Sequence, residues 1–139
     1  MMISARNQID VSVEEVHKGV VNSHVVLKTA QGTEMIASIT NGAVEAMGLR
    51  PGEKVVAFFK ASHVLIATGW AMTLSARNKL GGTITTLERG AVNAEVALRL
   101  PGGDILTAII TNEAAQDLAL KEGDEVVAII KATDVMIAK

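Results

Sequence analysis

The chain has 139 residues, of which 49% are hydrophobic and 20% are charged, a composition typical of a folded globular protein. Its formal net charge is −2, and it holds two Phe, one Trp and no Tyr, so a nucleic-acid or membrane-surface partner is not expected. The absence of cysteine excludes disulfides and thiol chemistry. We find no signal-peptide pattern and no apolar run of membrane-spanning length, and therefore expect a cytoplasmic protein.

Hydrophobic patterning in the first half predicts short strands. Apolar residues alternate along the first of them, and the others are rich in β-branched residues and bounded by turns. A short helix is expected at 43–49, between the third and fourth strands, with Thr40 or Asn41 as its N-cap. This order favours an all-β fold, an OB-like five-stranded barrel with one short helix. The strands are expected at 4–16, 19–28, 35–40, 54–60 and 64–67.

The second half repeats the first without a gap. Ser-Ala-Arg-Asn at 4–7 recurs at 75–78, an offset of 71 positions (75 minus 4). We therefore expect two tandem barrels, at 1–68 and 75–139, joined by a linker at 69–74 in which Trp70 packs. A unit of this size buries a limited core, so pairing within the chain and between chains is expected.

Comparison of the two copies separates retained polar residues from those that have drifted. The retained set contains cations, hydroxyls and amides, and no carboxylate. Each histidine has an acidic residue at the equivalent position, so a duplicated histidine site is not expected. Acid–base catalysis and metal-cation binding need carboxylates or histidines, which argues against an enzyme and against a metal-cation site. The retained pairs are Ser4/Ser75, Arg6/Arg77, Asn7/Asn78, Asn22/Asn93, Thr40/Thr111, Asn41/Asn112 and Lys60/Lys131, with Ser62/Thr133 as a near match.

This set of donors is typical of a site for an oxyanion. A desolvated oxyanion needs a ring of hydrogen-bond donors with cations to offset its charge. Arg6 and Lys60 could supply the charge, and Ser4, Thr40 and Ser62 the hydroxyls. Backbone N–H groups at the start of the helix would add further donors. Such a site needs no metal ion and no cofactor.

At these residues the sequence resembles the molbindins, the small molybdate- and tungstate-binding domains also called mop or TOBE-type domains. The resemblance covers nearly the whole chain twice. Four motifs occur in order. They are Ser-Ala-Arg-Asn at 4–7 and 75–78, Gly-Ala-Val-Asn-Ala-Glu-Val at 90–96, Ile-Thr-Asn at 39–41 and 110–112, and Lys-Ala-Ser/Thr at 60–62 and 131–133.

The resemblance implies a homotrimer of tandem chains, with molybdate bound at interfaces between barrels. Ala61 and Ala132 would act through their backbone alone, and so would Ala43 and Ala114, where some relatives have serine. Asn22 and Asn93 are candidates for a second kind of oxyanion site. The oxyanion contacts carried over are Ser4, Arg6, Thr40, Ala43, Lys60, Ala61, Ser62, Ser75, Arg77, Thr111, Ala114, Lys131, Ala132 and Thr133.

We therefore expect a binding protein for intracellular molybdenum storage, buffering or delivery. The main alternative is a molybdate-sensing regulatory module that acts on a partner protein. A nucleic-acid-binding OB module is a third hypothesis, disfavoured by the charge and the few aromatic residues. Donor identity alone does not set selectivity among molybdate, tungstate and sulfate, nor the equivalence of the sites in the two repeats.

Overall fold

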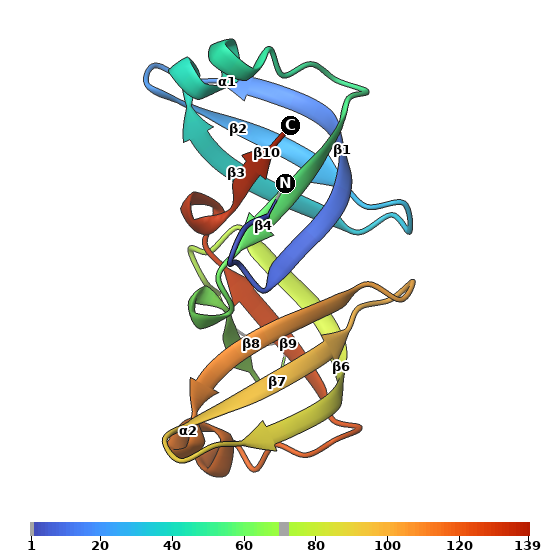
Figure 1. Ribbon diagram of the computed structural model, residues 1–139, viewed down its shortest axis with the longest axis vertical. Helices are drawn as coiled ribbons and strands as arrows, with labels where there is room; N and C mark the ends of the chain where they lie inside the picture. Colours follow the sequence, from blue (N-terminus) through green and yellow to red (C-terminus); the bar gives the residue numbers. More distant parts are fainter. Residues whose placement is uncertain (1, 70–72) are drawn as a thin grey trace.

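Two small β-barrels stack along the long axis of the molecule (Figure 1) in this computed structural model, which describes residues 2–69 and 73–139. The all-β fold expected from the sequence, with a short helix between the third and fourth strands of each half, is confirmed. The first half contains β1 (Asn7–Lys18), β2 (Asn22–Lys28), β3 (Glu34–Thr40), α1 (Asn41–Met47), β4 (Lys54–Phe59), the single 3₁₀ turn η1 (Ala61–His63) and β5 (Leu65–Ala67). The second half contains β6 (Asn78–Arg89), β7 (Asn93–Arg99), β8 (Ile105–Thr111), α2 (Asn112–Asp117), β9 (Glu125–Ile130), η2 (Ala132–Asp134) and β10 (Met136–Ala138).

The first strand of each half is long and bends around its barrel. In β1, Ile9, Val11 and Val13 are buried, because alternate side chains of a strand point to opposite faces. A register shift between Val13 and Glu15 interrupts the pairing with β2. Such a bulge bends and twists a strand, so β1 can pair with β4 along its first part and with β2 along its second. The same shift occurs in β6, between Ile84 and Thr86.

Each short helix has a threonine as its N-cap and is followed within two residues by a left-handed residue. Thr40 is the N-cap of α1, and its Oγ1 accepts a hydrogen bond from the backbone N–H of Ala43 at 3.1 Å. The helix therefore begins two residues earlier than the sequence pattern predicted. Gly48, at φ 61°, ends α1, whereas the equivalent residue after α2 is Ala119, at φ 51°.

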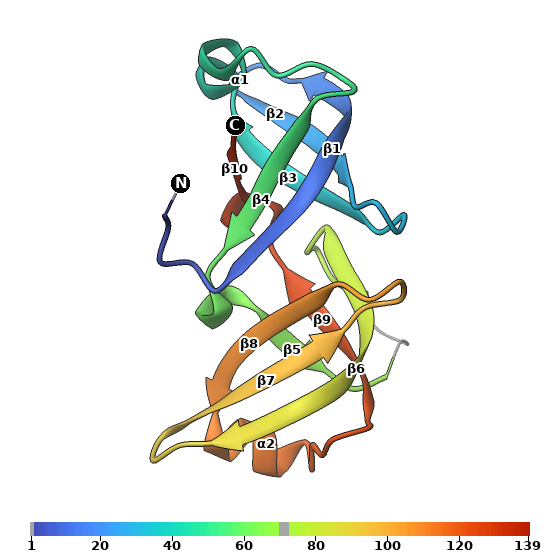
Figure 2. The same ribbon diagram turned by 45° about the vertical axis from the view of Figure 1, so that its right-hand side comes forward.

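The last strands of the two halves are exchanged. β10, at the end of the chain, pairs with β4 in the sheet of order β10-β4-β1-β2-β3. β5 pairs with β9 in the sheet of order β5-β9-β6-β7-β8. Figure 2 shows β10 beside β4 in the upper barrel and β5 beside β9 in the lower one. Each sheet thus contains one strand from the other repeat unit, an exchange that the sequence pattern did not predict. Trp70, which we expected to pack in the linker, lies outside the described residues.

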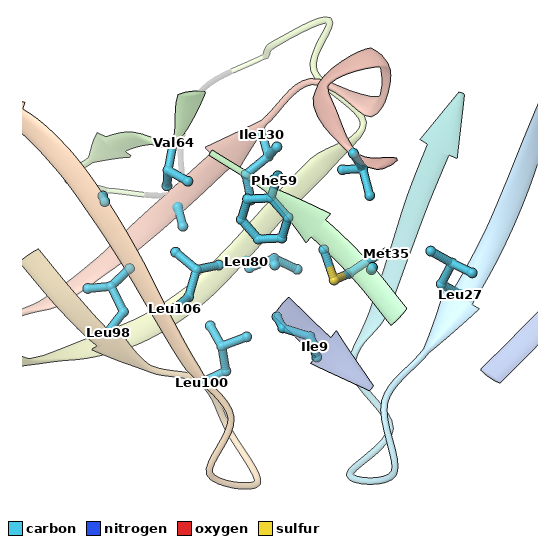
Figure 3. Packing of buried hydrophobic residues seen from close by; sticks show 14 of the residues in the cluster. Ile9, Leu27, Met35, Phe59, Val64, Leu80, Leu98, Leu100, Leu106 and Ile130 are labelled. Atoms are coloured by element: carbon cyan, nitrogen blue, oxygen red, sulfur yellow. The ribbon is translucent and has the colours of Figure 1, made fainter. Parts of the chain in front are cut away.

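One hydrophobic cluster runs through both barrels. It contains Leu27 and Met35 from the first half and Leu98 and Leu106 from the second, all fully buried. Phe59, at the end of β4, lies between these two groups (Figure 3) and is also fully buried. Because the two barrels share this core, separating them would expose apolar surface that neither half can cover alone.

Two buried asparagines bridge the barrels at equivalent positions. The side chain of Asn7 accepts a hydrogen bond from Thr107 N at 2.7 Å and donates one to Thr107 O at 2.8 Å. Asn78 makes the same pair of bonds with Ile36, at 2.7 and 2.8 Å. Thr107 and Ile36 lie on β8 and β3, which are edge strands. The asparagine amides therefore satisfy backbone groups of edge strands in the opposite half. Because the two contacts are reciprocal, they define a local two-fold relation between the halves.

Candidate functional site

The Lys-Ala-Ser/Thr segments lie where the two barrels meet. Each lysine directly precedes a single 3₁₀ turn, Lys60 before η1 and Lys131 before η2. The alanine that follows is buried, with 3% of Ala61 and 8% of Ala132 exposed, while the lysines are exposed. The small buried side chain anchors the turn, and the polar residues on either side remain at the surface.

Each of these turns packs against the opposite half. η1 contacts β8 of the second half, and η2 contacts β3 of the first half. One consequence is a groove of about 380 Å³ in which Ser62 of the first half lies near Thr111, Ala114 and Asn93 of the second. Four of the residues predicted from the sequence therefore meet there, and they come from both repeats.

A larger groove, of about 850 Å³, brings together six of the predicted residues. Five of them, from the second half, are Ser75, Arg77, Lys131, Ala132 and Thr133, and the sixth is Ser62 from the first half. We name this the Arg77 groove, defined by those six residues and by His24, Ser38, His63 and Asp134, which also line it.

Sequence reasoning missed several polar residues of the Arg77 groove. His24 and Ser38 lie on neighbouring strands and face each other in the β2–β3 register. Asp134 is 3.6 Å from the ring Nδ1 of His63, which occupies the equivalent position in the first half. The groove is thus not formed by donors alone, since it includes one carboxylate. None of these residues is retained between the copies, so the repeat comparison passed over them.

Arg6 differs from Arg77 in its surroundings. Its guanidinium forms an ion pair with Glu95 on β7 of the opposite half. About 53% of the Arg6 side chain and 37% of the Glu95 side chain are exposed to solvent. The sequence predicted that Arg6 would offer its charge to an anion, and here that charge is offset by a carboxylate. Ser4, two residues earlier, is exposed.

The threonines before the helices use their hydroxyls as caps. Ala43 N donates to Thr40 Oγ1, and Ala114 N donates to Thr111 Oγ1 at 3.0 Å. The two backbone N–H groups that we expected to serve an anion are therefore engaged within each helix start. The threonine side chains themselves are exposed.

The residues expected at a second kind of site lie at the first positions of β2 and β7. Asn22 is exposed and lies opposite Thr40, and Asn93 is exposed and lies opposite Thr111. Asn93 shares the smaller groove with Thr111, so it lies beside the first set of candidates.

Two other hollows in the described part of the chain contain none of the predicted site residues. A hollow of about 590 Å³ beside β6 is lined by residues 79–83, 99–102, 125 and 126 with Thr33, and these include none of the predicted residues. Within residues 2–69 and 73–139, no group of three His, Asp or Glu side chains is placed to hold a metal ion. None of the helices in the described part of the chain is long and apolar enough to cross a membrane.

The two stacked barrels with their shared grooves define a tandem OB-like β-barrel protein. The family model of the TOBE domain matches the chain twice, at residues 3–66 and 74–137, so the chain belongs to the TOBE domain family. The resemblance to the molbindins is thereby confirmed. A solved structure of a cytoplasmic molybdate-binding protein, ModG, with molybdate bound, superimposes with a TM-score of 0.96 and 42% identity, covering 99% of both chains.

Curated relatives are named for molybdenum. The chain is 40% identical over 139 residues to the molybdenum transport protein ModE of Herbaspirillum seropedicae, covering 99% of this chain and 52% of that protein. It is 37% identical over 139 residues to the molybdenum-pterin-binding protein MopA of Rhodobacter capsulatus, with 99% and 52% coverage. The chain thus spans about half the length of these relatives. Molybdenum-pterin-binding protein 3 of Clostridium pasteurianum is 50% identical over 66 residues, which is 48% of this chain and 97% of that protein.

Proposed function

We propose that this protein binds molybdate, or the similar tungstate, at the grooves between its two barrels. The observation that carries the proposal is the Arg77 groove, where Arg77, Lys131, Thr133 and Ser75 of one half meet Ser62 of the other. Two cations and three hydroxyls are suited to a tetrahedral dianion, because each oxygen needs donors and the net charge needs compensation. The ModG structure, which was solved with molybdate bound, shares this fold over its full length.

The cations have distinct tasks in this proposal. The planar guanidinium of Arg77 can donate two parallel hydrogen bonds to a pair of oxygens, which fixes the orientation of the anion. The ammonium of Lys131 acts as a compact charge on a flexible stem. The buried Ala132 holds the turn that carries Lys131 and Thr133, so their spacing is set by packing. By the local two-fold relation, Ser4, Arg6, Lys60, Ala61 and Ser62 form the counterpart set of contacts.

We infer further that the protein acts as a homotrimer. The Arg77 groove is much wider than a four-oxygen anion, so a second copy would be needed to close it. Two hairpin tips carry exposed valines, with 99% of Val20, 69% of Val21 and 71% of Val92 exposed. Burying these side chains against another copy would remove apolar surface from water. The proposed interface would cover them.

The proposed role is storage, buffering or delivery of molybdenum in the cytoplasm, without catalysis. It is supported by the likeness to a protein described as cytoplasmic and molybdate-binding. A second candidate is a molybdate-sensing module that acts on a partner protein. It is favoured by one observation, that a transcriptional regulator, ModE of Yersinia pestis, is 33% identical over 139 residues, which are 53% of its length.

Equilibrium dialysis against molybdate in excess sulfate, read by metal analysis, tests the proposal. The parent should retain molybdate, and the double variant Lys60→Ala with Lys131→Ala should lose most of the binding while remaining folded. Lys79→Ala with Lys121→Ala removes the same charge away from the grooves and should bind as the parent does. Equal binding by the Lys60/Lys131 variant and the parent would refute the site assignment. A complex with a partner that forms only with molybdate would favour the sensing role.

A further inference from the structure

The two arginine sites face different residues at one equivalent strand position. Glu95 on β7 forms the ion pair with Arg6, and the equivalent residue on β2 is His24, which lines the Arg77 groove. Within the described parts of the chain, no ion pair is found for Arg77. At this equivalent position, one arginine is thus paired with a carboxylate, and the other shares a groove with an imidazole.

The neighbouring strands enlarge this difference. Glu95 lies opposite Glu88 in the β6–β7 register, so two carboxylates face each other there. His24 lies opposite His17 in the β1–β2 register. Like charges directly across a sheet repel each other, and the Arg6 guanidinium offsets one of them. An anion approaching Arg6 meets this acidic pair, whereas an anion approaching the Arg77 groove meets His24, since His17 contacts Glu15 and does not line the groove.

A third position adds to the same contrast. Ser38 on β3 lies opposite His24 and lines the Arg77 groove. The equivalent residue on β8, opposite Glu95, is Ile109. A hydroxyl donor is thus present on the Arg77 side and replaced by an apolar side chain on the other. Because oxyanion affinity depends on the number of donors, this substitution favours the Arg77 side.

Asp134 is the one carboxylate among the residues that line the Arg77 groove. It lies 3.6 Å from Nδ1 of His63, which lines the groove beside it. Among the described residues no ion pair joins Asp134 to Arg77, whereas Glu95 contacts the Arg6 guanidinium directly. The contrast between the two arginine sites therefore depends on Glu95 and on His24 at the equivalent position.

We propose that the two arginine sites are unequal, and that Glu95 is an internal competitor for the Arg6 site. The Arg77 groove fills with oxyanion first. The Arg6 site fills only at higher ligand concentration, when the anion displaces the Glu95 carboxylate from the guanidinium. His24 and Glu95 are thus specificity-determining residues that set the order of filling. This inference rests on the proposed function, since it concerns the same oxyanion.

The test compares single variants of the full chain by equilibrium dialysis against molybdate. Arg77→Ala should remove the tighter class of sites, and Arg6→Ala should remove the weaker class alone. Glu95→Gln removes the competitor and should tighten the weaker class by about tenfold, while His24→Glu should weaken the tighter class by about tenfold. Glu122→Gln makes the same charge change as Glu95→Gln at a turn away from the grooves and should leave both classes unchanged.

The outcomes separate this inference from the proposed function. If the parent binds molybdate but Arg6→Ala and Arg77→Ala weaken binding equally, and Glu95→Gln binds as the parent does, the inequality is overturned. If the parent binds no molybdate, the proposed function fails, and the inference fails with it. If Arg6→Ala folds poorly, Glu95→Gln still tests the inference, because the Glu95→Gln variant leaves no unpaired carboxylate.

Discussion

The two halves of the molecule share a backbone plan and differ at the residues that face the grooves. Both halves retain the buried asparagine bridge, the threonine cap and the lysine before the 3₁₀ turn. They differ where His24 is replaced by Glu95 and Ser38 by Ile109. The contacts at the junction between the barrels are thus retained in both copies, because the asparagine of each half satisfies backbone groups of the other half. The walls of the grooves are free of this constraint and can diverge.

The asparagine bridges give the largest expected effect, and they should behave alike. Asn7→Ala and Asn78→Ala each remove two hydrogen bonds and leave the backbone of Thr107 or Ile36 unpaired. Each should lower the free energy of unfolding by about 3 kcal/mol, measured by urea denaturation. Asn22→Ala, at an exposed asparagine, is the matched control and should have little effect. Clearly unequal losses for Asn7 and Asn78 would break the equivalence of the two halves.

A buried hydroxyl is present in one half and missing from the other. Ser23 Oγ donates to Asn41 Oδ1 at 2.5 Å, whereas Ala94 stands at the equivalent position and Asn112 Oδ1 has no partner among the described residues. Ser23→Ala should therefore destabilise the protein by about 1 to 2 kcal/mol.

The reverse change sharpens this contrast. Ala94→Ser would supply the missing donor to Asn112 and should raise the free energy of unfolding by about 1 kcal/mol. The melting temperature of both variants, followed by circular dichroism, provides the measurement. A loss of stability in Ala94→Ser would show that the second half lacks room for the hydroxyl.

The helix ends give a smaller difference of backbone origin. Gly48 and Ala119 occupy equivalent positions, at φ 61° and φ 51°. An L-residue with a side chain is strained in this region, while glycine is not. Ala119→Gly should stabilise the protein by about 1 kcal/mol, and Gly48→Ala should destabilise it by a similar amount, measured by thermal unfolding. Equal effects of the same sign would contradict the backbone explanation.

The smallest expected effect concerns the last residue of the chain. Lys139 Nζ lies 2.7 Å from Glu53 Oε2 and donates to Met47 O at 2.8 Å. The hydrogen bond from Lys139 to the Glu53 carboxylate lowers the pKa of Glu53 below its ordinary value, and burial opposes this with a smaller effect. The stabilisation from this ion pair is therefore present above the ordinary pKa of a glutamate and is lost as the pH falls through the lowered pKa of Glu53. In Lys139→Ala the pKa of Glu53 should rise toward its ordinary value, as measured by NMR titration.

The strands and helices could be predicted from the sequence because their signals are local. Alternating apolar residues marked β1, and Thr40 marked the helix start. The exchange of last strands could not be predicted, because Leu65-Ile66-Ala67 and Met136-Ile137-Ala138 carry the same pattern and suit either barrel equally. The same holds for the pairing of Arg6 with Glu95, since residues 89 positions apart in sequence meet only after the fold is complete.

The exchanged strands have a consequence for a cleaved chain. A protease cut between Ala67 and Ser75 would yield two fragments, each carrying the edge strand of the other's sheet. Neither fragment would have a complete barrel when isolated, so each should need its mate in order to refold. In the intact chain the covalent link keeps the two halves at a fixed, high effective concentration. Completion of the barrels therefore does not depend on the protein concentration.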